Sequence, residues 1–458
     1  MVGRVPSEDG ERELRGCALR ELFEETGILL CQPRGPGKKH PPSKQAVAAC
    51  RRALLERNAG PDGNAEKNVL ECFLDANDLS LDVDPLSYLT RLITPRFSKL
   101  RYDATYFLLE TDCEPVIIDG ELTGGDWYTP AAALAAWRRK DIAIAAPAVT
   151  ILEELQRQPL SKALERLGAL APEFEGSGRG VPFAPGYEIL PLEAQSLVPG
   201  MPCNAILVGD RRFVLVDPGP GEGDARDHLV EAVERRLGRG DSLEAIVLTH
   251  HHVDHVGSVE ACRLRFRVPL LAHPVTGELL STSLDRELVD GDRIELGDSP
   301  DGRPGWFLEA LFTPGHAAGH LAFFDKRTRS LIAGDLLSTV VSMYVGSPGG
   351  DLGKYLSSLA RIRDLPTEVL YPGHGAPTNA AKKLIDRQVE HRNERIEKVF
   401  HALSRETRAL ESIASEVYAD TDPRLRTLTQ RTTRAALEYL VERGRAAAVG
   451  KDRFVSGK

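Results

Sequence analysis

The sequence has few cysteines and no long apolar run, and each shortage excludes a class of protein. Its seven cysteines are scattered among 458 residues and form no C-x-x-C pair. A disulfide scaffold is therefore excluded, and we expect a reducing, cytoplasmic environment. No stretch approaches the ~18 apolar residues that a transmembrane helix needs, so we expect no membrane partner. The first residues, MVGRVPSEDGERELRG, lack an apolar core, and no secretory signal is expected.

The length of the chain and its glycine- and proline-rich stretch indicate several domains. A chain of 458 residues suggests two or three domains. Residues 173–186 are rich in glycine and proline and show no hydrophobic period, which predicts a linker. The linker separates an N-terminal domain (1–172) from a central domain (187–380). A long helical pattern beginning at Lys382 then opens a C-terminal domain (381–458).

The central block alternates short apolar runs with helical stretches. Residues 204–217 predict a hairpin, 226–239 a helix and 243–250 a buried strand that ends at histidines. Further strand-like runs, each ending in a polar residue that could bind a metal, are 307–316, 330–338 and 369–375. Strands that bring polar side chains to their ends predict a layered α/β domain with one site along its edge.

The stretch LTHHHVDHVGS, residues 248–258, carries the strongest chemical signal. His250, His252 and His255 follow the spacing H-x-H-x-x-H, with Asp254 between the last two. Further candidates at later strand ends are His316, Asp335 and His374. Imidazole and carboxylate are ligands that zinc takes. A lone histidine is most often a surface residue, but this set has no comparable structural explanation and predicts a metal site.

Residues 187–380 resemble the metallo-β-lactamase fold hydrolases. The motifs that carry the resemblance are THHHVDH, TPGHAAGH, GD and PGHG, and the resemblance implies an αββα sandwich. It also implies two ions, Zn²⁺ or alternatively iron or manganese. One ion would be held by His250, His252 and His316, the other by Asp254, His255 and His374, and Asp335 would bridge them. Asp254 and Asp335 would be the catalytic residues, and Asp217 would orient the ligand loop.

Three other histidines receive different predictions. His251 points away from its neighbours if the loop alternates direction, and the resemblance does not require a histidine there, so we expect no ligand role. His320 matches a histidine common in this part of the family, and we expect it either to have a structural role behind the metal ligands or to lie near the substrate. His273 follows a strand, and a structural role is favoured.

The predicted chemistry is hydrolysis. Two ions ~3.5–4 Å apart can bridge a water and lower its pKa toward ~7, which gives a hydroxide nucleophile near neutral pH. No side-chain nucleophile is obvious, and none is needed. Esters, thioesters, lactams and phosphodiesters all remain open as the bond that is cleaved. An ester or thioester of a small-molecule substrate is the main hypothesis.

The C-terminal block raises an alternative, a single-strand-specific endoribonuclease. HRNERI in 391–396 resembles the corresponding region of lactamase-like members that carry a C-terminal winged helix, some of which cleave single-stranded RNA. The order helix, turn, helix and hairpin in 381–458 agrees. However, this block has 17 Lys and Arg against 12 Asp and Glu and no series of aromatics. A packing or dimerising module is therefore favoured over nucleic-acid binding, and the oligomeric state is left open.

The N-terminal block has its own motif, LRELFEETGILL at 19–30. Glu21, Glu24 and Glu25 would share one helix face, and such crowded carboxylates favour a bound Mg²⁺ or Mn²⁺. The motif resembles the Nudix box, and 93–110 and 124–137 resemble members that act on coenzyme A compounds. The implied α+β domain would hydrolyse or bind a nucleoside-diphosphate compound. The chain starts two residues before Gly3, the first glycine of the pattern, so the strands that precede the box are expected to be missing.

Overall fold

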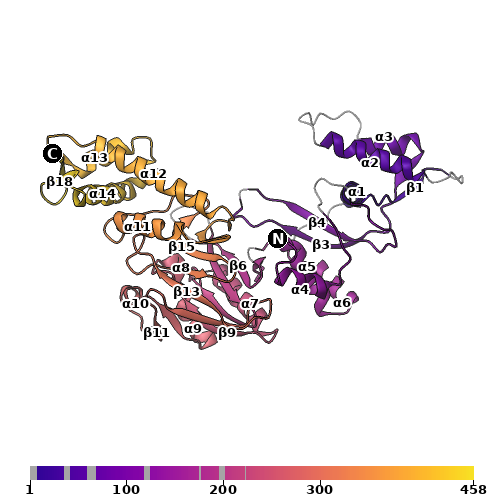
Figure 1. Cartoon of the computed structure of the whole chain (residues 1–458), viewed down its shortest axis with the longest axis horizontal. Coiled ribbons are helices and arrows are strands. Elements are labelled where there is room, and N and C mark those ends of the chain that lie inside the picture. Colours follow the sequence, from indigo (N-terminus) through magenta and orange to yellow (C-terminus); the bar gives the residue numbers. More distant parts are fainter. Residues whose placement is uncertain are drawn as a thin grey trace. The chain divides into compact units, whose positions relative to one another are not determined.

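The chain folds into two compact units (Figure 1). The computed structural model describes residues 8–35, 42–58, 69–98, 100–117, 124–174, 177–194, 202–221 and 223–457. Unit 1 comprises Met1–Ile93, Tyr102–Ala136 and Pro147–Pro172, and unit 2 comprises Thr94–Arg101, Trp137–Ala146 and Glu173–Lys458. Two short segments from the first third of the chain thus belong to unit 2. No helix in the described ranges is long and apolar enough to span a membrane.

Unit 1 combines helices with two small antiparallel sheets in its described part, β1 with β2 and β3 with β4. Its helices are α1 (Glu8–Thr26), α2 (Lys44–Asn58), α3 (Val69–Ala76), α4 (Pro130–Arg138), α5 (Ala146–Arg157) and α6 (Leu160–Gly168). Its strands are β1 (Cys31–Pro33), β2 (Leu79–Leu81), β3 (Ser87–Ile93) and β4 (Asp103–Leu108). Gly3 lies outside the described residues.

Helix α1 anchors the core of unit 1 through residues one turn apart. Phe23 is fully buried among Leu54 of α2 and Leu70 of α3, and Leu19 packs with Leu86 in a neighbouring cluster. The spacing of four residues places both side chains on one helix face. Each contributes about 1.5–3 kcal/mol through burial, so the helix that carries the predicted carboxylates is held by its opposite, apolar face.

Unit 2 is built on one long folded sheet. Its order is β11-β10-β9-β8-β7-β16-β15-β14-β13-β12, and β6 pairs both with β7 and with β5. Its strands are β5 (Val181–Ala184), β6 (Tyr187–Leu192), β7 (Cys203–Gly209), β8 (Arg212–Val216), β9 (Ser242–Val247), β10 (Leu270–Ala272), β11 (Arg286–Glu287), β12 (Arg293–Gly297), β13 (Trp306–Phe312), β14 (Leu321–Asp325), β15 (Ser330–Ser338) and β16 (Val369–His374). The hairpin predicted at 204–217 is confirmed as β7 and β8. Residues 181–184 lie in the predicted linker 173–186 but form β5, because they pair with β6.

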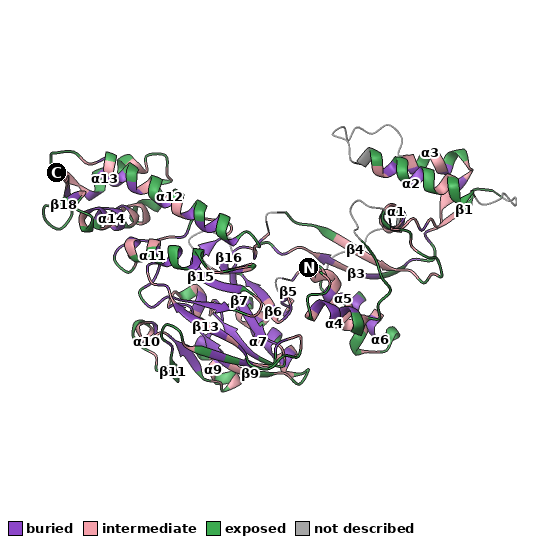
Figure 2. Ribbon diagram, viewed as in Figure 1, coloured by how far each residue is buried: buried purple, intermediate pink, exposed green. Residues whose placement is uncertain are grey.

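The two halves of this sheet enclose a shared core. Val214 and Val216 of β8 pack with Leu308 of β13 and Phe323 of β14. The alternate residues of β8 face the other way and pack under helices α7 (Asp224–Leu237) and α9 (Val259–Phe266). Strand residues alternate between two faces, and both faces are apolar, so the strands lie buried between layers (Figure 2). Sheet faces sheet, and helices cover the outside.

The other outer layer contains helices from the end of the chain. Its members are α11 (Leu352–Arg363), α12 (Ala381–His401), α13 (Leu410–Val417) and α14 (Arg426–Glu442). They form one apolar cluster with β14, β15 and β16. A three-stranded sheet accompanies α13 and α14, with the order β17 (Arg408–Ala409), β19 (Arg453–Ser456), β18 (Ala446–Ala448). Short helices α8 (Val253–Val256) and α10 (Pro274–Leu280) and the 3₁₀ turn η1 (Pro423–Leu425) complete the unit.

Candidate metal centre

The histidine-rich stretch emerges from a buried strand and turns at once into short helices. His250 follows β9 and is fully buried, while His252 immediately precedes α8 and Asp254 and His255 lie within it. His316 lies four residues beyond β13, and His374 is the last residue of β16. Asp335 lies inside β15, not at its end. The fold brings all of these side chains to one place from four separate segments.

The first group of side chains has the spacing of donors around one ion. His252 Nδ1 lies 3.0 Å from His250 Nε2 and 2.9 Å from His316 Nε2. His316 Nε2 lies 3.4 Å from Asp335 Oδ2. Donors bound to one tetrahedral zinc at about 2.0–2.2 Å lie roughly 3.3–3.6 Å apart. These four side chains form a close group of possible ligands and need only small shifts to hold one ion.

The second group gathers around the other oxygen of Asp335. Asp335 Oδ1 lies 3.3 Å from His255 Nε2 and 3.5 Å from His374 Nε2. His374 Nε2 lies 3.4 Å from Asp254 Oδ2. The Oδ1 atom is buried and has no hydrogen-bond partner. A buried carboxylate oxygen without a donor calls for a cation, and the two oxygens of this one side chain face two separate groups.

Glycine makes the close approach of the second group possible. A Cβ atom at Gly373 would come within 2.3 Å of Asp335 Oδ1 and 2.9 Å of His255. Any larger residue at this position would displace the carboxylate. Gly373 is therefore needed because only a residue without a side chain leaves room for Asp335 and His255.

The protonation states differ between the two groups. Burial, and then the neighbouring imidazoles, lower the pKa of His252 to about 3, and burial also lowers the pKa of His250 and His316. These imidazoles are neutral at physiological pH and offer lone pairs, as ligands must. Burial alone would lower the pKa of His374 too, but the carboxylates of Asp335 and Asp254 outweigh it and raise it to about 11. In the absence of a metal, a proton supplies the positive charge there.

The nitrogens that face away from the two groups are held by fixed acceptors. His316 Nδ1 lies 2.7 Å from the carbonyl oxygen of Tyr344, and His374 Nδ1 lies 3.0 Å from that of Pro202. Because a carbonyl only accepts, Nδ1 carries a proton in both rings, and Nε2 is the atom that could bind a metal once any proton on it has left. The tautomer of each ring is thus set by the backbone.

Asp217 fixes the start of the ligand loop. It adopts a left-handed φ of 50° directly after β8. Its carboxylate accepts from the Thr249 backbone N–H at 2.7 Å and from the Thr249 hydroxyl at 2.6 Å, and lies 2.9 Å from His255 Nδ1. One side chain thereby ties the end of β8 to both ends of the loop.

The remaining histidines, His251, His320 and His273, lie in three different surroundings. His251 is half-buried and belongs to neither group of close ligand atoms. His320 is fully buried, with Nδ1 2.9 Å from the Thr313 hydroxyl and its ring 5.3 Å from that of His250. His273 accepts from the Val275 N–H at the start of α10 and stacks on Phe312. His273 is therefore structural.

Cys203 is a neighbour of the site that the sequence reasoning missed. Its thiol is fully buried, with Sγ 3.6 Å from His255 Nδ1, and it forms a close group with His255 and His374. An isolated cysteine carries no spacing signal. Only the pairing of β7 with β16, which sets Cys203 opposite His374, reveals the contact.

Comparison with known proteins shows the family to which the chain belongs. Residues 198–374 match the metallo-beta-lactamase superfamily, and residues 5–157 match the Nudix domain described as NUDT19 Nudix domain. The lactamase-like protein vrtG of Penicillium aethiopicum is 30% identical over 243 residues, which cover 50% of this chain and 72% of that relative. The chain belongs to the metallo-beta-lactamase superfamily. It is a hydrolase enzyme with a Nudix domain at its N-terminus.

Two further relatives and one solved structure are also similar to this chain. The hydroxyacylglutathione hydrolase of Thermosynechococcus vestitus is 35% identical over 162 residues, or 34% of this chain and 59% of that relative. The chain likewise spans 59% of the lactamase-like protein adaB of Aspergillus niger, at 31% identity over 44% of this chain. A beta-lactamase domain protein from Burkholderia ambifaria shares the fold, with a TM-score of 0.52 at 20% identity, over 61% of this chain and 94% of that one.

The Nudix domain does not gather its three predicted carboxylates into a comparable group. The side chain of Glu21 is 54% exposed and pairs with Arg20 at 2.6 Å, and Glu24 lies 3.6 Å from the same guanidinium. Glu25 is exposed. In the described residues, Glu21, Glu24 and Glu25 form no close ligand group. They share α1 as predicted, but Arg20 neutralises part of the charge that would attract Mg²⁺ or Mn²⁺.

Proposed function

We propose that the central domain cleaves an ester, thioester or related bond of a small-molecule substrate and uses two divalent metal ions to do so. The observation that carries the proposal is Asp335, whose two buried oxygens face two different groups of histidines. Such a carboxylate is suited to bridge two ions. When bound, a pair of ions would activate water near neutral pH and polarise the bond under attack.

The residues divide this work between them. His250, His252 and His316 would hold one ion, and Asp254, His255 and His374 the other. Burial keeps the first three imidazoles neutral, so no proton has to leave them. The carbonyls of Tyr344 and Pro202 and the carboxylate of Asp217 hold the rings in the orientation that binding requires. The metal itself is proposed as zinc, with iron or manganese as alternatives.

The substrate class rests on likeness. Hydroxyacylglutathione hydrolase, 35% identical over 162 residues, is named for an acylated thiol as its substrate. The central domain has the same type of fold. Cys203 lies beside the second ligand group, but its thiol is fully buried. We therefore favour acyl thioesters and esters over phosphodiesters.

A matched substrate panel tests the proposal. The full chain, loaded with Zn²⁺, would be offered acyl thioesters, aryl esters and a phosphodiester of similar size. We expect turnover of the acyl compounds, loss of turnover with a chelator and recovery when Zn²⁺ is restored. Turnover that survives complete removal of metal would contradict the metal-dependent mechanism, and turnover confined to the phosphodiester would contradict the substrate class.

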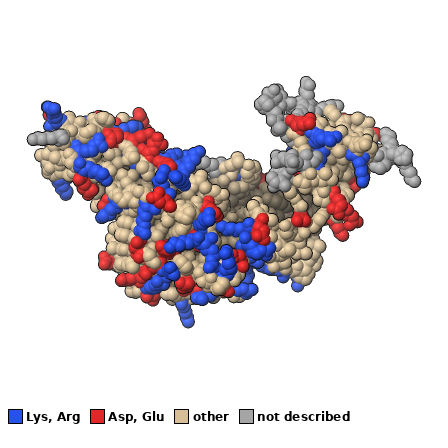
Figure 3. Space-filling view, viewed as in Figure 1, with Lys and Arg blue, Asp and Glu red and all other residues tan. Residues whose placement is uncertain are grey.

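A second candidate, cleavage of single-stranded RNA, is favoured by the shape of the C-terminal elements. A long helix, then β17, α13, α14 and the β18–β19 hairpin follow the order of a winged helix. Its charge argues the other way, because acidic and basic side chains are interspersed over the face seen in Figure 3. Cleavage of an unstructured RNA with steep salt dependence would establish this activity.

The Nudix domain adds a third candidate, hydrolysis or binding of a nucleoside-diphosphate compound such as a coenzyme A derivative. The full chain and its Glu24→Gln variant would be compared for release of a phosphorylated product with Mg²⁺ or Mn²⁺. Loss of turnover in the variant would identify Nudix chemistry. Binding without turnover in both proteins would make the domain a binding module.

A further inference from the structure

The backbone around Asp335 leaves the regular ladder of strand β15. This strand pairs with β16 at residues 330–332, at Gly334 and again at Ser338, and the register shifts on both sides of Gly334. Within the described part of β15, residues 335–337 therefore have no partner on β16. A buried carbonyl outside a ladder needs another donor. The backbone position of Asp335 thus depends on contacts from other elements.

The hydroxyl of Tyr355 supplies one of these contacts. Tyr355 lies on α11, is fully buried, and donates to the carbonyl oxygen of Leu336 at 2.8 Å. Leu336 directly follows Asp335, whose two carboxylate oxygens lie 3.3–3.5 Å from histidine nitrogens of both ligand groups. The hydrogen bond therefore holds the backbone one residue away from the proposed bridging ligand.

Gln388 of α12 sets the direction of this hydrogen bond. Its Nε2 donates to the Tyr355 hydroxyl oxygen at 3.1 Å and to Ser342 Oγ at 3.1 Å. Because an amide N–H only donates, the phenol keeps its own proton for another acceptor, which is the Leu336 carbonyl. The side chains of Gln388 and Tyr355 are both buried, so water competes little for these bonds.

Helix α11 is itself fixed against the other ligand loop. The hydroxyl of Ser358 donates to the carbonyl of Pro314 at 2.7 Å. A Cβ atom at Gly315, the residue before His316, would come within 2.3 Å of the Tyr355 backbone. The helix thus approaches the His316 loop at the residue that also bonds to the strand of Asp335. Tyr355 joins the two ligand segments that meet in the first group.

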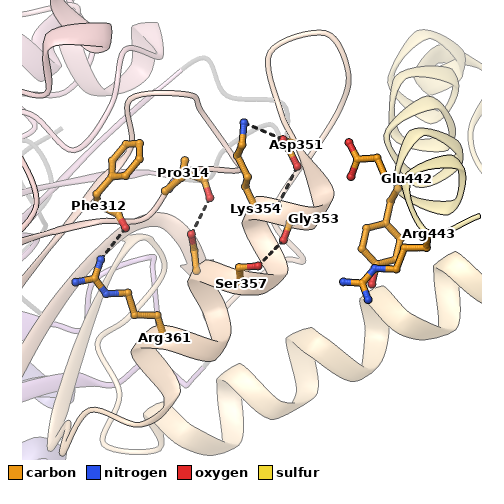
Figure 4. A pocket seen from close by; sticks show the side chains of 11 residues that line it. Phe312, Pro314, Asp351, Gly353, Lys354, Ser357, Arg361, Glu442 and Arg443 are labelled. Atoms are coloured by element: carbon orange, nitrogen blue, oxygen red, sulfur yellow. Dashed lines mark hydrogen bonds and ion pairs between the residues drawn. The ribbon is translucent and has the colours of Figure 1, made fainter.

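Another face of α11 is open. Lys354, Ser357 and Arg361 line a cleft of about 520 Å³ between α11 and α14 (Figure 4). Tyr355 is not among the residues that line this cleft, and it belongs instead to the apolar cluster that includes Leu336 and Leu359. Tyr355 therefore lies on the packed face of α11, where its hydroxyl reaches β15.

We propose that Tyr355 is a positioning residue for the bridging carboxylate of Asp335, and that Gln388 supports it by directing its hydroxyl. The inference rests on the proposed function, since it requires the two ions that Asp335 would bridge. Partners that orient metal ligands typically account for about 10–100-fold in metal affinity. Tyr355 acts through one backbone carbonyl, so we expect the lower value. Because Asp335 belongs to both ligand groups, both ions should be affected.

Metal titration of the full chain tests the proposal. Zn²⁺ binding would be measured by competition with a chelator for the wild type, Tyr355→Phe, Gln388→Glu and the double variant. Tyr355→Phe removes only the hydroxyl and should weaken the binding of both ions about tenfold. The visible absorption of bound Co²⁺, which depends on ligand geometry, should change in the same variant.

Gln388→Glu tests the direction of the hydrogen bond. The new carboxylate would accept the phenol proton and compete with the Leu336 carbonyl for it. The guanidinium of Arg392, which lies 5.5 Å from the centre of the Tyr355 ring, would offset the added charge. Gln388→Glu should therefore weaken both ions like Tyr355→Phe. The double variant should lose little more, because both changes break one hydrogen bond. Wild-type affinity in Gln388→Glu would overturn the role of Gln388.

Tyr187→Phe is the matched control. Tyr187 is also a buried tyrosine of unit 2, and its hydroxyl donates to Asp325 at 2.9 Å, outside both ligand groups. This variant should bind both ions like the wild type. Equal affinities in Tyr355→Phe and the wild type, weakening of one ion alone, or equal weakening in Tyr187→Phe would overturn the inference. A wild type that binds fewer than two ions would overturn the proposed function and this inference with it.

Discussion

Replacing Asp335 by asparagine should remove both metal ions together. The side chain keeps its shape but loses its charge, and its amide nitrogen can only donate. In the wild type, one carboxylate oxygen of Asp335 faces His316 Nε2 at 3.4 Å, and the other faces Nε2 of His255 and of His374 at 3.3 and 3.5 Å. In the variant, an N–H would point into one of these groups and compete with the ion there.

The size of the effect follows from the position of Asp335 between the groups. Partners that act only through a ligand account for about 10–100-fold in metal affinity. A direct and shared ligand should exceed this, so we expect each ion to be held more than about 100-fold more weakly, or roughly 2.7 kcal/mol. Chelator competition with Zn²⁺, together with the metal content after dialysis, measures the change.

The comparison variant is His251→Ala, which should retain two ions and wild-type affinity. His251 lies next to two proposed ligands in sequence but belongs to neither close group. Retention of both ions by Asp335→Asn would refute the bridging role. Equal loss of metal from Asp335→Asn and His251→Ala would refute the prediction that His251 is not a ligand.

Three further predictions use the same protein. His316→Ala and His374→Ala should each lose a different single ion, so each variant should keep one equivalent of Zn²⁺ by metal analysis; loss of two from either would contradict separate positions. The carboxylates of Asp335 and Asp254 raise the pKa of His374 to about 11, so a metal ion that binds His374 must displace a proton. The Zn²⁺ affinity of the ion held by His374 should therefore rise by up to about tenfold per pH unit between about pH 7 and 9. A pH-independent affinity measured by chelator competition would argue against that. Asp325 accepts hydrogen bonds from the buried Tyr187 hydroxyl at 2.9 Å and from the Trp306 indole at 2.7 Å. Asp325→Ala should therefore lower the free energy of unfolding, measured by urea titration, by about 2–5 kcal/mol without changing the metal content. An unchanged urea midpoint would contradict this prediction.

The sequence predicts the seven proposed ligands because each lies in a short motif at or near the end of a strand. Strand ends that deliver polar side chains meet at one edge of a layered fold. The spacing H-x-H-x-x-H identified the loop, and the isolated His316, Asp335 and His374 followed from their positions after apolar runs. The geometry agrees even for Asp335, which lies inside its strand.

Other contributors left no trace in the sequence. Tyr344 acts through its carbonyl oxygen, and every residue has one. Cys203 reaches the site because β7 pairs with β16, a contact between residues 171 positions apart. In the Nudix domain, helical spacing placed Glu21, Glu24 and Glu25 on one helix, but it could not show that Arg20 binds two of them. Contacts through space decide such roles.

Unit 2 includes two segments from the early part of the chain, Thr94–Arg101 and Trp137–Ala146, and this affects how the protein can be truncated. Phe97, from one of the two early segments in unit 2, is buried in the core between the sheet halves, and Lys140, from the other, donates to the carbonyl of Thr328 at 3.1 Å. A fragment that begins at residue 187 would lack both and would expose apolar surface where Phe97 had been. Such surface invites aggregation. The metallo-β-lactamase domain therefore needs these two early segments for a complete core. A truncated chain that loses the first 186 residues would lose stability in the metallo-β-lactamase domain as well as the Nudix domain itself.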